Sequence, residues 1–305
     1  MLKVHTYQEN LFGDICADKE QKAIERFRLA SDMSMRLYKK PLVIAYSGGK
    51  DSDVLLALAV RSGIPFEVLH SLTTADAPET VRHVKDTFKR LEAKGVKCTV
   101  DKHIQPDGSR VTMWNLIPRK LMPPTRRVRY CCSVLKEGGG KDRFIATGVR
   151  WDESTARKRR GGLEVIASDI KKTLILSNDN DEDRRLFENC QMKGKRVVNP
   201  IVDWKTEDIL NYIEAEHICM NPLYKCGFKR VGCIGCPMAS RTRTFEFSMF
   251  PKIKGAYIRA FGKMLEVRRQ RELPTIWQTG IDVFHWWMED GVLPGQEVLN
   301  GFEEV

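Results

Sequence analysis

Six consecutive residues, Ser47-Gly48-Gly49-Lys50-Asp51-Ser52, have types and a spacing suited to holding a phosphate group. The two glycines allow the backbone to approach a phosphate closely, the two serines offer hydroxyl groups, and Lys50 adds a cation. The spacing is not that of the Walker P-loop, whose glycines flank a longer loop before Lys-Ser/Thr. A Gly-Gly turn after a strand can also be only a tight turn, but six specified residues together predict a nucleotide-binding loop.

The residues on either side of this motif predict the elements that position it. Residues 42–46 form a short apolar run typical of a buried strand, and residues 54–60 give a helical pattern that Gly63 closes. The motif therefore falls in a strand-to-helix turn, where free backbone N–H groups and the positive end of the helix dipole favour an anion.

Strands and helices alternate along the following sequence. Strands are predicted at residues 66–69, 96–100 and 144–149, and a helix opens at Pro78 and is ended by Gly95. This alternation predicts an α/β fold with a doubly wound, mostly parallel sheet. Ligands of such sheets bind at the carboxyl ends of the strands, which is where the motif lies.

The chain of 305 residues is long enough to bury a large core, and its pattern predicts three parts. These are an N-terminal helical segment (1–40), a nucleotide-binding α/β domain (41–205), and a cysteine-rich loop with C-terminal helices (206–305). Two helical patterns in the last part are separated around Pro274.

The amino-acid composition indicates which class of protein this is and what charge its partner carries. The hydrophobic fraction of 42% is that of a soluble globular protein, no apolar run approaches a membrane span, and the N-terminus lacks the apolar core of a signal peptide. We therefore expect a cytoplasmic protein with no membrane partner. The formal charge of +11 implies an anionic partner, and both ATP and nucleic acid would fit it.

Nine cysteines in such a chain favour metal or thiol chemistry over a disulfide framework. Cys226, Cys233 and Cys236 lie in one glycine-containing loop, and the pair Cys131-Cys132 can supply a fourth ligand from a distant part of the chain. Four thiolates suit either zinc or an iron–sulfur cluster, and the spacing does not separate the two. The remaining cysteines that we interpret as small buried thiols are Cys16, Cys98, Cys190 and Cys219.

Several blocks between about residues 40 and 240 resemble, in order, the phosphoadenosine phosphosulfate reductase family, which belongs to the PP-motif ATP pyrophosphatases. The blocks are SGGKDS, Asp76-Ala77-Pro78-Glu79-Thr80, Arg129-Tyr130-Cys131-Cys132-Ser133-Val134-Leu135-Lys136, Gly148-Val149-Arg150-Trp151-Asp152-Glu153-Ser154, Asn199-Pro200-Ile201-Val202-Asp203-Trp204 and Asn221-Pro222-Leu223-Tyr224. The resemblance implies an adenine nucleotide alpha-hydrolase-like fold. Its subgroups include sulfonucleotide reductases, the small subunit of ATP sulfurylase, and the adenylating components of DNA phosphorothioation systems.

The resemblance also implies roles for single residues. Lys50 would stabilise the leaving pyrophosphate, and Asp51 would help to hold Mg²⁺, although it can also simply cap the following helix. Gly148, Arg150 and Arg157 match the region that faces the nucleotide phosphates in this family. Asp76 would contact a metal or the ribose, and its alternative role is that of an N-cap before Pro78.

Three details bear on the choice within the family. The reductases use a nucleophilic cysteine in a C-terminal Glu-Cys-Gly-Leu-His segment, and this chain has no cysteine after Cys236. The intact Lys50-Asp51 resembles the members that cleave ATP. The cysteines resemble both an iron–sulfur pattern with tandem Cys131-Cys132 and the phosphorothioation pattern with Cys226. We predict a [4Fe–4S] cluster on Cys131, Cys226, Cys233 and Cys236, with Cys132 as the alternative ligand and zinc as the alternative metal.

The sequence thus predicts an ATP pyrophosphatase that adenylates an acceptor for sulfur transfer, preferably a DNA backbone phosphate in phosphorothioate modification. The basic runs 119–120, 126–129 and 157–160 can follow a phosphate backbone or form only a solvated face. A sulfur donor such as a cysteine desulfurase, and other subunits of a modification system, are partners that the resemblance implies. The alternatives are a reductase of adenylyl sulfate or its phosphorylated form, and a non-catalytic zinc-containing subunit that binds nucleic acid.

Overall fold

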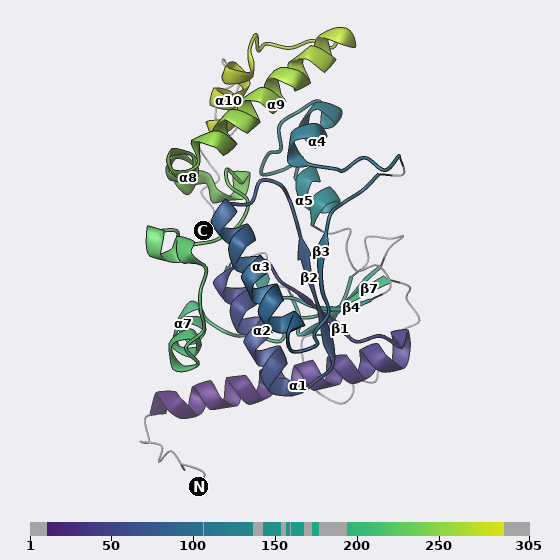
Figure 1. Ribbon diagram of the computed structural model, residues 1–305, viewed down its shortest axis with the longest axis vertical. Helices are drawn as coiled ribbons and strands as arrows, with labels where there is room; N and C mark the ends of the chain where they lie inside the picture. Colours follow the sequence, from purple (N-terminus) through teal and green to yellow (C-terminus); the bar gives the residue numbers. More distant parts are fainter. Residues whose placement is uncertain are drawn as a thin grey trace. The chain divides into compact units, whose positions relative to one another are not determined.

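A mostly parallel sheet forms the frame of the described part of the chain, with strand order β3-β2-β1-β4-β7-β5-β6 (Figure 1). Strand β1 (Leu42–Ala45) pairs in parallel with β2 (Phe66–Ser71) and with β4 (Phe144–Ala146). Strand β4 in turn pairs in parallel with β7 (Gly194–Val198), and β3 (Cys98–Asp101) forms the other edge. Strands β5 (Leu163–Ala167) and β6 (Thr173–Leu176) extend the sheet in antiparallel fashion.

The computed structural model describes residues 11–105, 107–136, 143–153, 157–158, 160–167, 173–176 and 194–289. Contacts divide the chain into two units, each assembled from separate stretches. Unit 1 comprises Met1–His70, Glu79–Val100 and Gly140–Val231, and unit 2 comprises Ser71–Pro78, Asp101–Gly139 and Gly232–Val305. The predicted boundaries at residues 40 and 205 concern continuous segments of chain, and they stay predictions.

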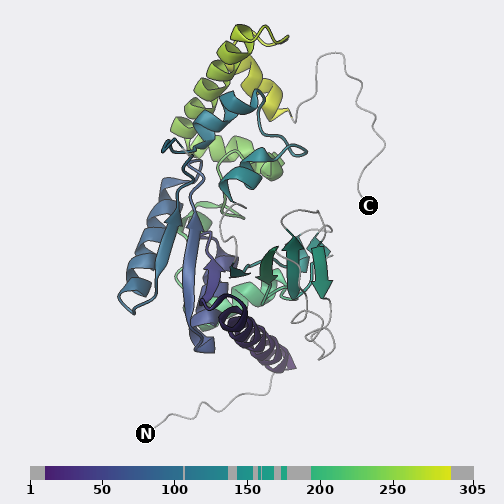
Figure 2. The ribbon, with the colours of Figure 1, turned by 90° about the vertical axis from the view of Figure 1, so that its right-hand side faces the viewer.

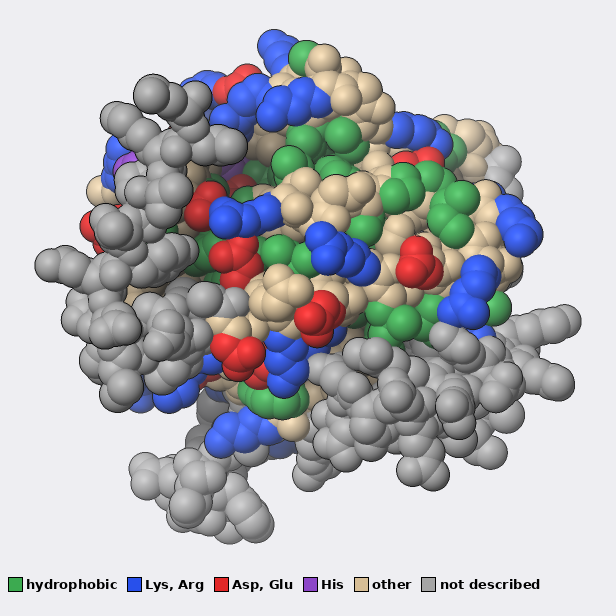
Figure 3. Space-filling model, turned by 90° about the horizontal axis from the view of Figure 1, so that it is seen from below, with side chains coloured by type: hydrophobic (Ala, Val, Ile, Leu, Met, Phe, Trp, Pro, Cys, Tyr) green, Lys and Arg blue, Asp and Glu red, His purple; other side chains and the backbone are tan. Residues whose placement is uncertain are grey.

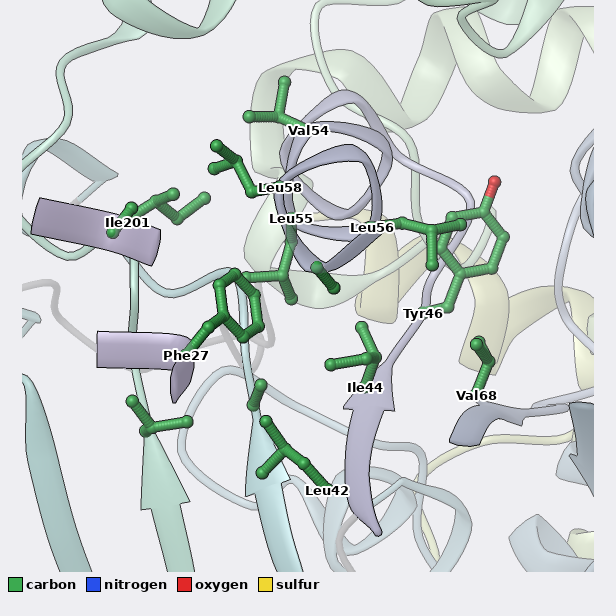
Figure 4. Packing of buried hydrophobic residues seen from close by; sticks show 14 of the residues in the cluster. Phe27, Leu42, Ile44, Tyr46, Val54, Leu55, Leu56, Leu58, Val68 and Ile201 are labelled. Carbon is green, nitrogen blue, oxygen red and sulfur yellow. The ribbon is translucent and has the colours of Figure 1, made fainter. Parts of the chain in front are cut away.

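Four helices of unit 1 contribute residues to its hydrophobic core, together with the strands of the sheet. They are α1 (Leu11–Tyr38), α2 (Lys50–Ser62), α3 (Pro78–Glu92) and α7 (Thr206–Ala215). Helix α1, purple in Figure 1, contacts α2 and the strands β1, β4 and β7. In the close view, Phe27 from α1 and Leu55 from α2 point toward one another above β1, whose Leu42 and Ile44 complete that layer (Figure 4).

Residues on the opposite face of the strands are also buried. Val43 in β1, Ile145 in β4 and Val197 in β7 are each at most 4% exposed, and they alternate with the residues that face α1 and α2. A strand buried on both faces reads as a continuous apolar run, which is why residues 42–46 were recognisable from the sequence.

The predicted doubly wound, mostly parallel α/β fold is confirmed. The predicted strand at 144–149 is shorter than expected, because β4 ends at Ala146. The predicted closure of the first helix by Gly63 is also confirmed, since Gly63 adopts a φ of 71° and its N–H binds the Val60 carbonyl. Strands β5, β6 and β7 were not predicted.

Unit 2 is mainly helical and contains α4 (Met113–Lys120), α5 (Tyr130–Leu135), α8 (Arg243–Met249), α9 (Pro251–Gln270) and α10 (Gly280–Met288). Helices α4 and α10 both pack against α9 (Figure 2). A Cβ on Gly280 would lie 2.3 Å from the Ile258 carbonyl oxygen, so only glycine permits this approach of α10 to α9. The predicted pair of C-terminal helices on either side of Pro274 is confirmed.

None of the helices in the described ranges is both long and apolar enough to span a membrane. On the face drawn in Figure 3, Lys and Arg side chains are interspersed with Asp and Glu. The formal charge of +11 is therefore not gathered into a single positive patch on that face.

Candidate functional site

The motif Ser47–Ser52 is a turn that its own hydrogen bonds hold in shape. It follows β1 and enters α2, as predicted. Gly48 has a φ of 75°, which favours glycine, and a Cβ there would lie only 3.0 Å from Cγ2 of Val84. The Gly49 N–H donates to Ser52 Oγ at 3.1 Å, and that hydroxyl donates to the Gly49 carbonyl at 2.7 Å. Ser52 therefore braces the start of α2, whereas Ser47 is exposed.

Both carboxylate oxygens of Asp51 are paired with cations. Lys50 Nζ lies 3.0 Å from Oδ2, and Arg150 Nε lies 2.7 Å from Oδ1. The Arg150 side chain is only 2% exposed, and its Nη1 also donates to the carbonyl of Trp204 at 3.3 Å. Gly148 lies beside the motif, because a Cβ there would be 3.4 Å from the Asp51 carbonyl oxygen, an ordinary contact distance. Arg150 is thus placed to orient Asp51, and its contact with a nucleotide stays a prediction.

Further arginines add positive charge to this part of unit 1. The side chain of Arg157 is half-buried and forms an ion pair with Glu153. Burial lowers the pKa of Arg157, and the neighbouring cations Arg230 and Arg160 lower it further, while Asp51 opposes them. Positive charges crowded in this way are stabilised by an anion placed among them. Of the basic run 157–160, Arg159 lies outside the described residues.

The segment Asn221–Tyr224, far along the chain, is hydrogen-bonded to the phosphate-binding motif. The Tyr224 hydroxyl oxygen accepts a hydrogen bond of 3.0 Å from the Lys50 N–H. Asn221 is 1% exposed, and its Nδ2 donates to the Gly48 carbonyl at 3.0 Å. Neither residue was predicted to belong to the site, although both lie in the Asn-Pro-Leu-Tyr block that carries part of the family resemblance.

A buried polar network includes Tyr46 and Asp53, the residues that directly precede and follow the motif. The Tyr46 hydroxyl donates to Asp53 Oδ1 at 2.6 Å, and His83 Nε2 lies 3.1 Å from the same oxygen. Burial, together with the Asp53 carboxylate, raises the pKa of Tyr46, so this phenol stays protonated. The network ties α2 to β1 and α3. Sequence reasoning missed it, because a Tyr, an Asp and a His at these separations form no recognisable motif.

Four of the five candidate cysteine ligands belong to unit 2. The pKa of Cys131 is raised by its hydrogen bond with Cys132 and by burial, and the charges of Cys233 and Cys236 contribute. Burial also raises the pKa of Cys233, which lies 3.3 Å from the Thr73 hydroxyl. Cys226 is exposed and belongs to unit 1. The structure thus describes electrostatic interactions among Cys131, Cys132, Cys233 and Cys236.

Two charged residues of unit 2 accompany these thiols. The charge of Cys233 is the main cause that raises the pKa of Lys136, and Asp76 contributes. Asp76 Oδ2 accepts hydrogen bonds of 2.8 Å from both the N–H and the hydroxyl of Thr73, and its backbone bridges to Cys233. Asp76 therefore caps its own turn. A contact with metal or ribose stays a prediction.

The described thiols are suitable donors for a metal, but their sulfur atoms are not arranged as the ligands of one metal ion. Among the described residues, no group of three or more His, Cys, Asp or Glu side chains is arranged to hold a metal ion. The charges of Cys132, Cys233 and Cys236 nevertheless contribute to raising the pKa of Cys131. Thiolate sulfur is the donor that zinc and iron–sulfur clusters prefer, so the donor set fits either group.

The other cysteines differ in part from the prediction of small buried thiols. Cys98 is half-buried, and burial raises its pKa to about 11. Cys219 is exposed, which contradicts the prediction, because it lies in the loop that follows α7 rather than on a core face. The side chains of Cys16 and Cys190 lie outside the described residues.

A family model described as the phosphoadenosine phosphosulfate reductase domain matches residues 41–239 of this chain. The chain belongs to this family. Members of the family are enzymes that act on ATP or on sulfonucleotides. The match covers the phosphate-binding motif, Arg150, the Asn221–Tyr224 segment and the five candidate cysteine ligands. The resemblance that the sequence blocks predicted is confirmed.

Individual relatives are distant. The chain is 24% identical over 242 residues to an uncharacterized protein of Methanocaldococcus jannaschii, which covers 76% of this chain and 42% of that protein. It is 29% identical over 201 residues to sulfate adenylyltransferase subunit 2 of Streptomyces lavendulae, covering 61% of this chain and 57% of the relative. The chain thus spans less than two thirds of the length of these relatives. Among solved structures, phosphoadenylyl-sulfate reductase of Candida auris matches with a TM-score of 0.43 and 15% identity, covering 75% of this chain and 97% of that one.

Proposed function

We propose that this member of the family is an ATP pyrophosphatase that adenylates an acceptor for sulfur transfer. The observation that carries the proposal is the phosphate-binding motif at the start of α2, with Lys50 and Asp51 intact beside the arginines at 150, 157 and 230. The similarity to sulfate adenylyltransferase subunit 2 supports it, because that name denotes transfer of an adenylyl group.

The proposed reaction is a substitution at the α-phosphorus of ATP. An acceptor oxygen forms a bond to that phosphorus, and the bond from it to the bridging oxygen of the β-phosphate breaks. The electron pair of the broken bond leaves with pyrophosphate, and the acceptor becomes an adenylate. Lys50 and Arg157 stabilise the negative charge that develops on the leaving group.

Asp51 is suited to help hold Mg²⁺ together with the phosphates. A carboxylate offers about four lone-pair positions, and Lys50 and Arg150 use one each. When bound, Mg²⁺ would neutralise charge on the phosphates. Arg150 fixes the orientation of the Asp51 carboxylate, because its buried guanidinium donates to Oδ1 at 2.7 Å.

The preferred acceptor is a DNA backbone phosphate. Five cations of unit 2 support an interaction with a polyanion because all are exposed: Arg119, Lys120, Arg126, Arg127 and Arg129. Binding through such contacts weakens steeply with salt, with a slope of about −0.9 per phosphate neutralised. A sulfur donor such as a cysteine desulfurase, and further subunits of a modification system, are the partners that we propose by resemblance.

The cysteines would hold a [4Fe–4S] cluster, with zinc as the alternative. Cys131, Cys233 and Cys236 are common to both proposed ligand sets. Cys132 completes the set within unit 2, and Cys226 of unit 1 is the other candidate for the fourth ligand. A cluster would supply sulfur or electrons to the adenylated acceptor. Iron and sulfide analysis of Cys132→Ser and Cys226→Ser proteins purified without oxygen would identify the fourth ligand, because only the variant that removes it should lose the cluster.

The test of the proposed function is pyrophosphate release from ATP and Mg²⁺ by protein purified without oxygen, with and without DNA. Lys50→Ala and Asp51→Ala should abolish release, whereas Lys85→Ala, which removes an exposed lysine of α3, should not. Sulfite production from adenylyl sulfate, without pyrophosphate release, would instead establish the reductase that the family name suggests. Zinc in the purified protein, with DNA binding and no turnover of either nucleotide, would establish the non-catalytic alternative.

A further inference from the structure

The hydroxyl group of Tyr224 occupies a special position in the phosphate-binding loop. Its oxygen accepts a 3.0 Å hydrogen bond from the N–H of Lys50, the first residue of α2. The backbone N–H of Val231 also interacts with this oxygen. A Cβ added to Gly49 would lie 3.4 Å from the Tyr224 hydroxyl, so the phenol lies directly against the glycine turn.

This arrangement leaves the hydroxyl hydrogen of Tyr224 to donate elsewhere. Burial raises the pKa of Tyr224 to about 12, and Asp51 and Asp53 contribute, so the phenol keeps its proton at neutral pH. Backbone N–H groups approach the lone pairs of the oxygen. The hydrogen bonds that the structure describes at this hydroxyl group are ones in which its oxygen is the acceptor. A phenol that accepts from N–H groups is polarised and becomes a stronger donor.

The sequence predicted free backbone N–H groups at the start of α2, but two of these groups already have hydrogen-bond acceptors within the protein. The Gly49 N–H is held by Ser52 Oγ, and the Lys50 N–H by Tyr224. An anion that approaches this end of the helix meets an O–H donor at the position where a backbone N–H was expected. The positive end of the helix dipole strengthens that donor further.

We propose that Tyr224 donates its hydroxyl hydrogen to a phosphate oxygen of the bound nucleotide, and so passes the donor capacity of the Lys50 N–H on to the ligand. The inference rests on the proposed function in that it requires a polyphosphate at this loop. It adds a ligand-binding residue 174 positions away from the motif.

Asn221 prepares this position before any ligand binds. Its Oδ1 accepts from the Leu223 N–H at 3.1 Å, and its Nδ2 donates to the Gly48 carbonyl and to the Thr80 hydroxyl. The short helix η3 (Pro222–Cys226) that carries Tyr224 is thereby fixed to the loop on one side and to α3 on the other. Asn221 is a positioning residue, and the phenol loses little further freedom when a phosphate arrives.

The experiment is calorimetric titration of the full chain with inorganic pyrophosphate, with ATP and with adenosine. Tyr224→Phe should weaken binding of pyrophosphate and of ATP by about 10-fold or more, as expected for a lost hydrogen bond to a charged group. Adenosine, which has no phosphate, should bind both proteins equally. The matched control is Tyr212→Phe, because the Tyr212 hydroxyl contacts Glu20 and should leave all three affinities unchanged.

Each result supports or overturns the inference. If Tyr224→Phe binds pyrophosphate as well as the natural protein, or better because the Lys50 N–H is released, Tyr224 is not a phosphate ligand. If Tyr224→Phe also loses affinity for adenosine, the substitution has disturbed the structure of the site. The deciding variant is then Tyr224→4-aminophenylalanine, because its amino group keeps a hydrogen-bond donor at this position. Restored pyrophosphate binding in that variant supports the inference, and its absence overturns it. If the natural protein itself binds neither pyrophosphate nor ATP, the proposed function fails and this inference fails with it.

Discussion

The ion pair between Asp51 and Arg150 should couple strongly in folding, and a double-mutant cycle measures that coupling. The variants are Asp51→Ala, Arg150→Ala and the double variant, each compared by urea unfolding. The matched pair is Arg61 with Glu216, which also belongs to unit 1 and also has an N–O distance of 2.7 Å. The two pairs differ in exposure, and each has one further ionic partner, since Arg61 also pairs with Glu20 and Asp51 with Lys50.

The structure sets the expected magnitude. Two unit charges with centres about 4 Å apart interact by about 4 kcal/mol at an effective dielectric constant of about 20. The cost of burying Arg150, which is 2% exposed, offsets part of this, so we expect a coupling free energy of about 2 kcal/mol. Arg61 and Glu216 are 49% and 39% exposed, and solvent screening should reduce their coupling to between about 0.2 and 1 kcal/mol.

The assay is the free energy of unfolding of the natural protein and of the three variants of each pair, at low salt and at neutral pH. Asp51→Ala alone should cost about 3 kcal/mol, because it leaves Arg150 buried with only weaker partners. A coupling below about 0.5 kcal/mol for Asp51 and Arg150, or one equal to that of the exposed pair, would refute the reasoning. In that case the buried guanidinium would be stabilised by its other contacts, and not by the carboxylate.

Two further predictions concern packing and pH. Gly235→Ala should destabilise the protein by several kcal/mol, because the new Cβ would lie 2.2 Å from Phe247 Cζ and the φ of this residue is 72°. Gly95→Ala should cost only about 1 kcal/mol, because Gly95 has a similar φ of 80° but open space around it. Equal losses of stability in urea unfolding would contradict this prediction. Burial opposes ionisation of Asp203, but hydrogen bonds from Arg26 hold the pKa of this carboxyl below its usual value. The ionised Asp203 therefore stabilises the fold above its unfolded pKa, and this contribution is lost as the pH falls through the folded pKa. Unfolding free energies of Asp203→Asn should thus fall less between neutral pH and about pH 3 than those of the natural protein, and parallel curves would contradict the assignment.

Local patterns determined the elements around the phosphate-binding motif. The apolar run at 42–46, the two glycines and the periodic helix closed by Gly63 each act within a few residues, so the sequence alone placed β1, the loop and α2. The cysteine spacing and the family blocks likewise lie within short windows. These features are readable because the turns, caps and buried strands that they specify depend on neighbours in the chain.

Strand β7 illustrates what a local pattern does not contain. Its sequence Gly194-Lys195-Arg196-Val197-Val198 carries two cations and does not read as a buried strand. It lies between β4 and β5 because its backbone pairs with Phe144–Ala146 on one side and Leu163–Ala167 on the other. The Arg196 guanidinium is accommodated by the Tyr38 hydroxyl of α1, 158 residues away.

The sequence alone was enough to predict the family, the mostly parallel sheet and a loop suited to a phosphate. Tertiary structure decided which side chains complete that loop. Arg150 meets Asp51 across 99 residues, and Tyr224 meets Lys50 across 174. The physical reason is that the hydrogen bonds of a loop and its helix close within a few residues. A buried charge or a phenol gains its partner only after the sheet has brought distant segments together.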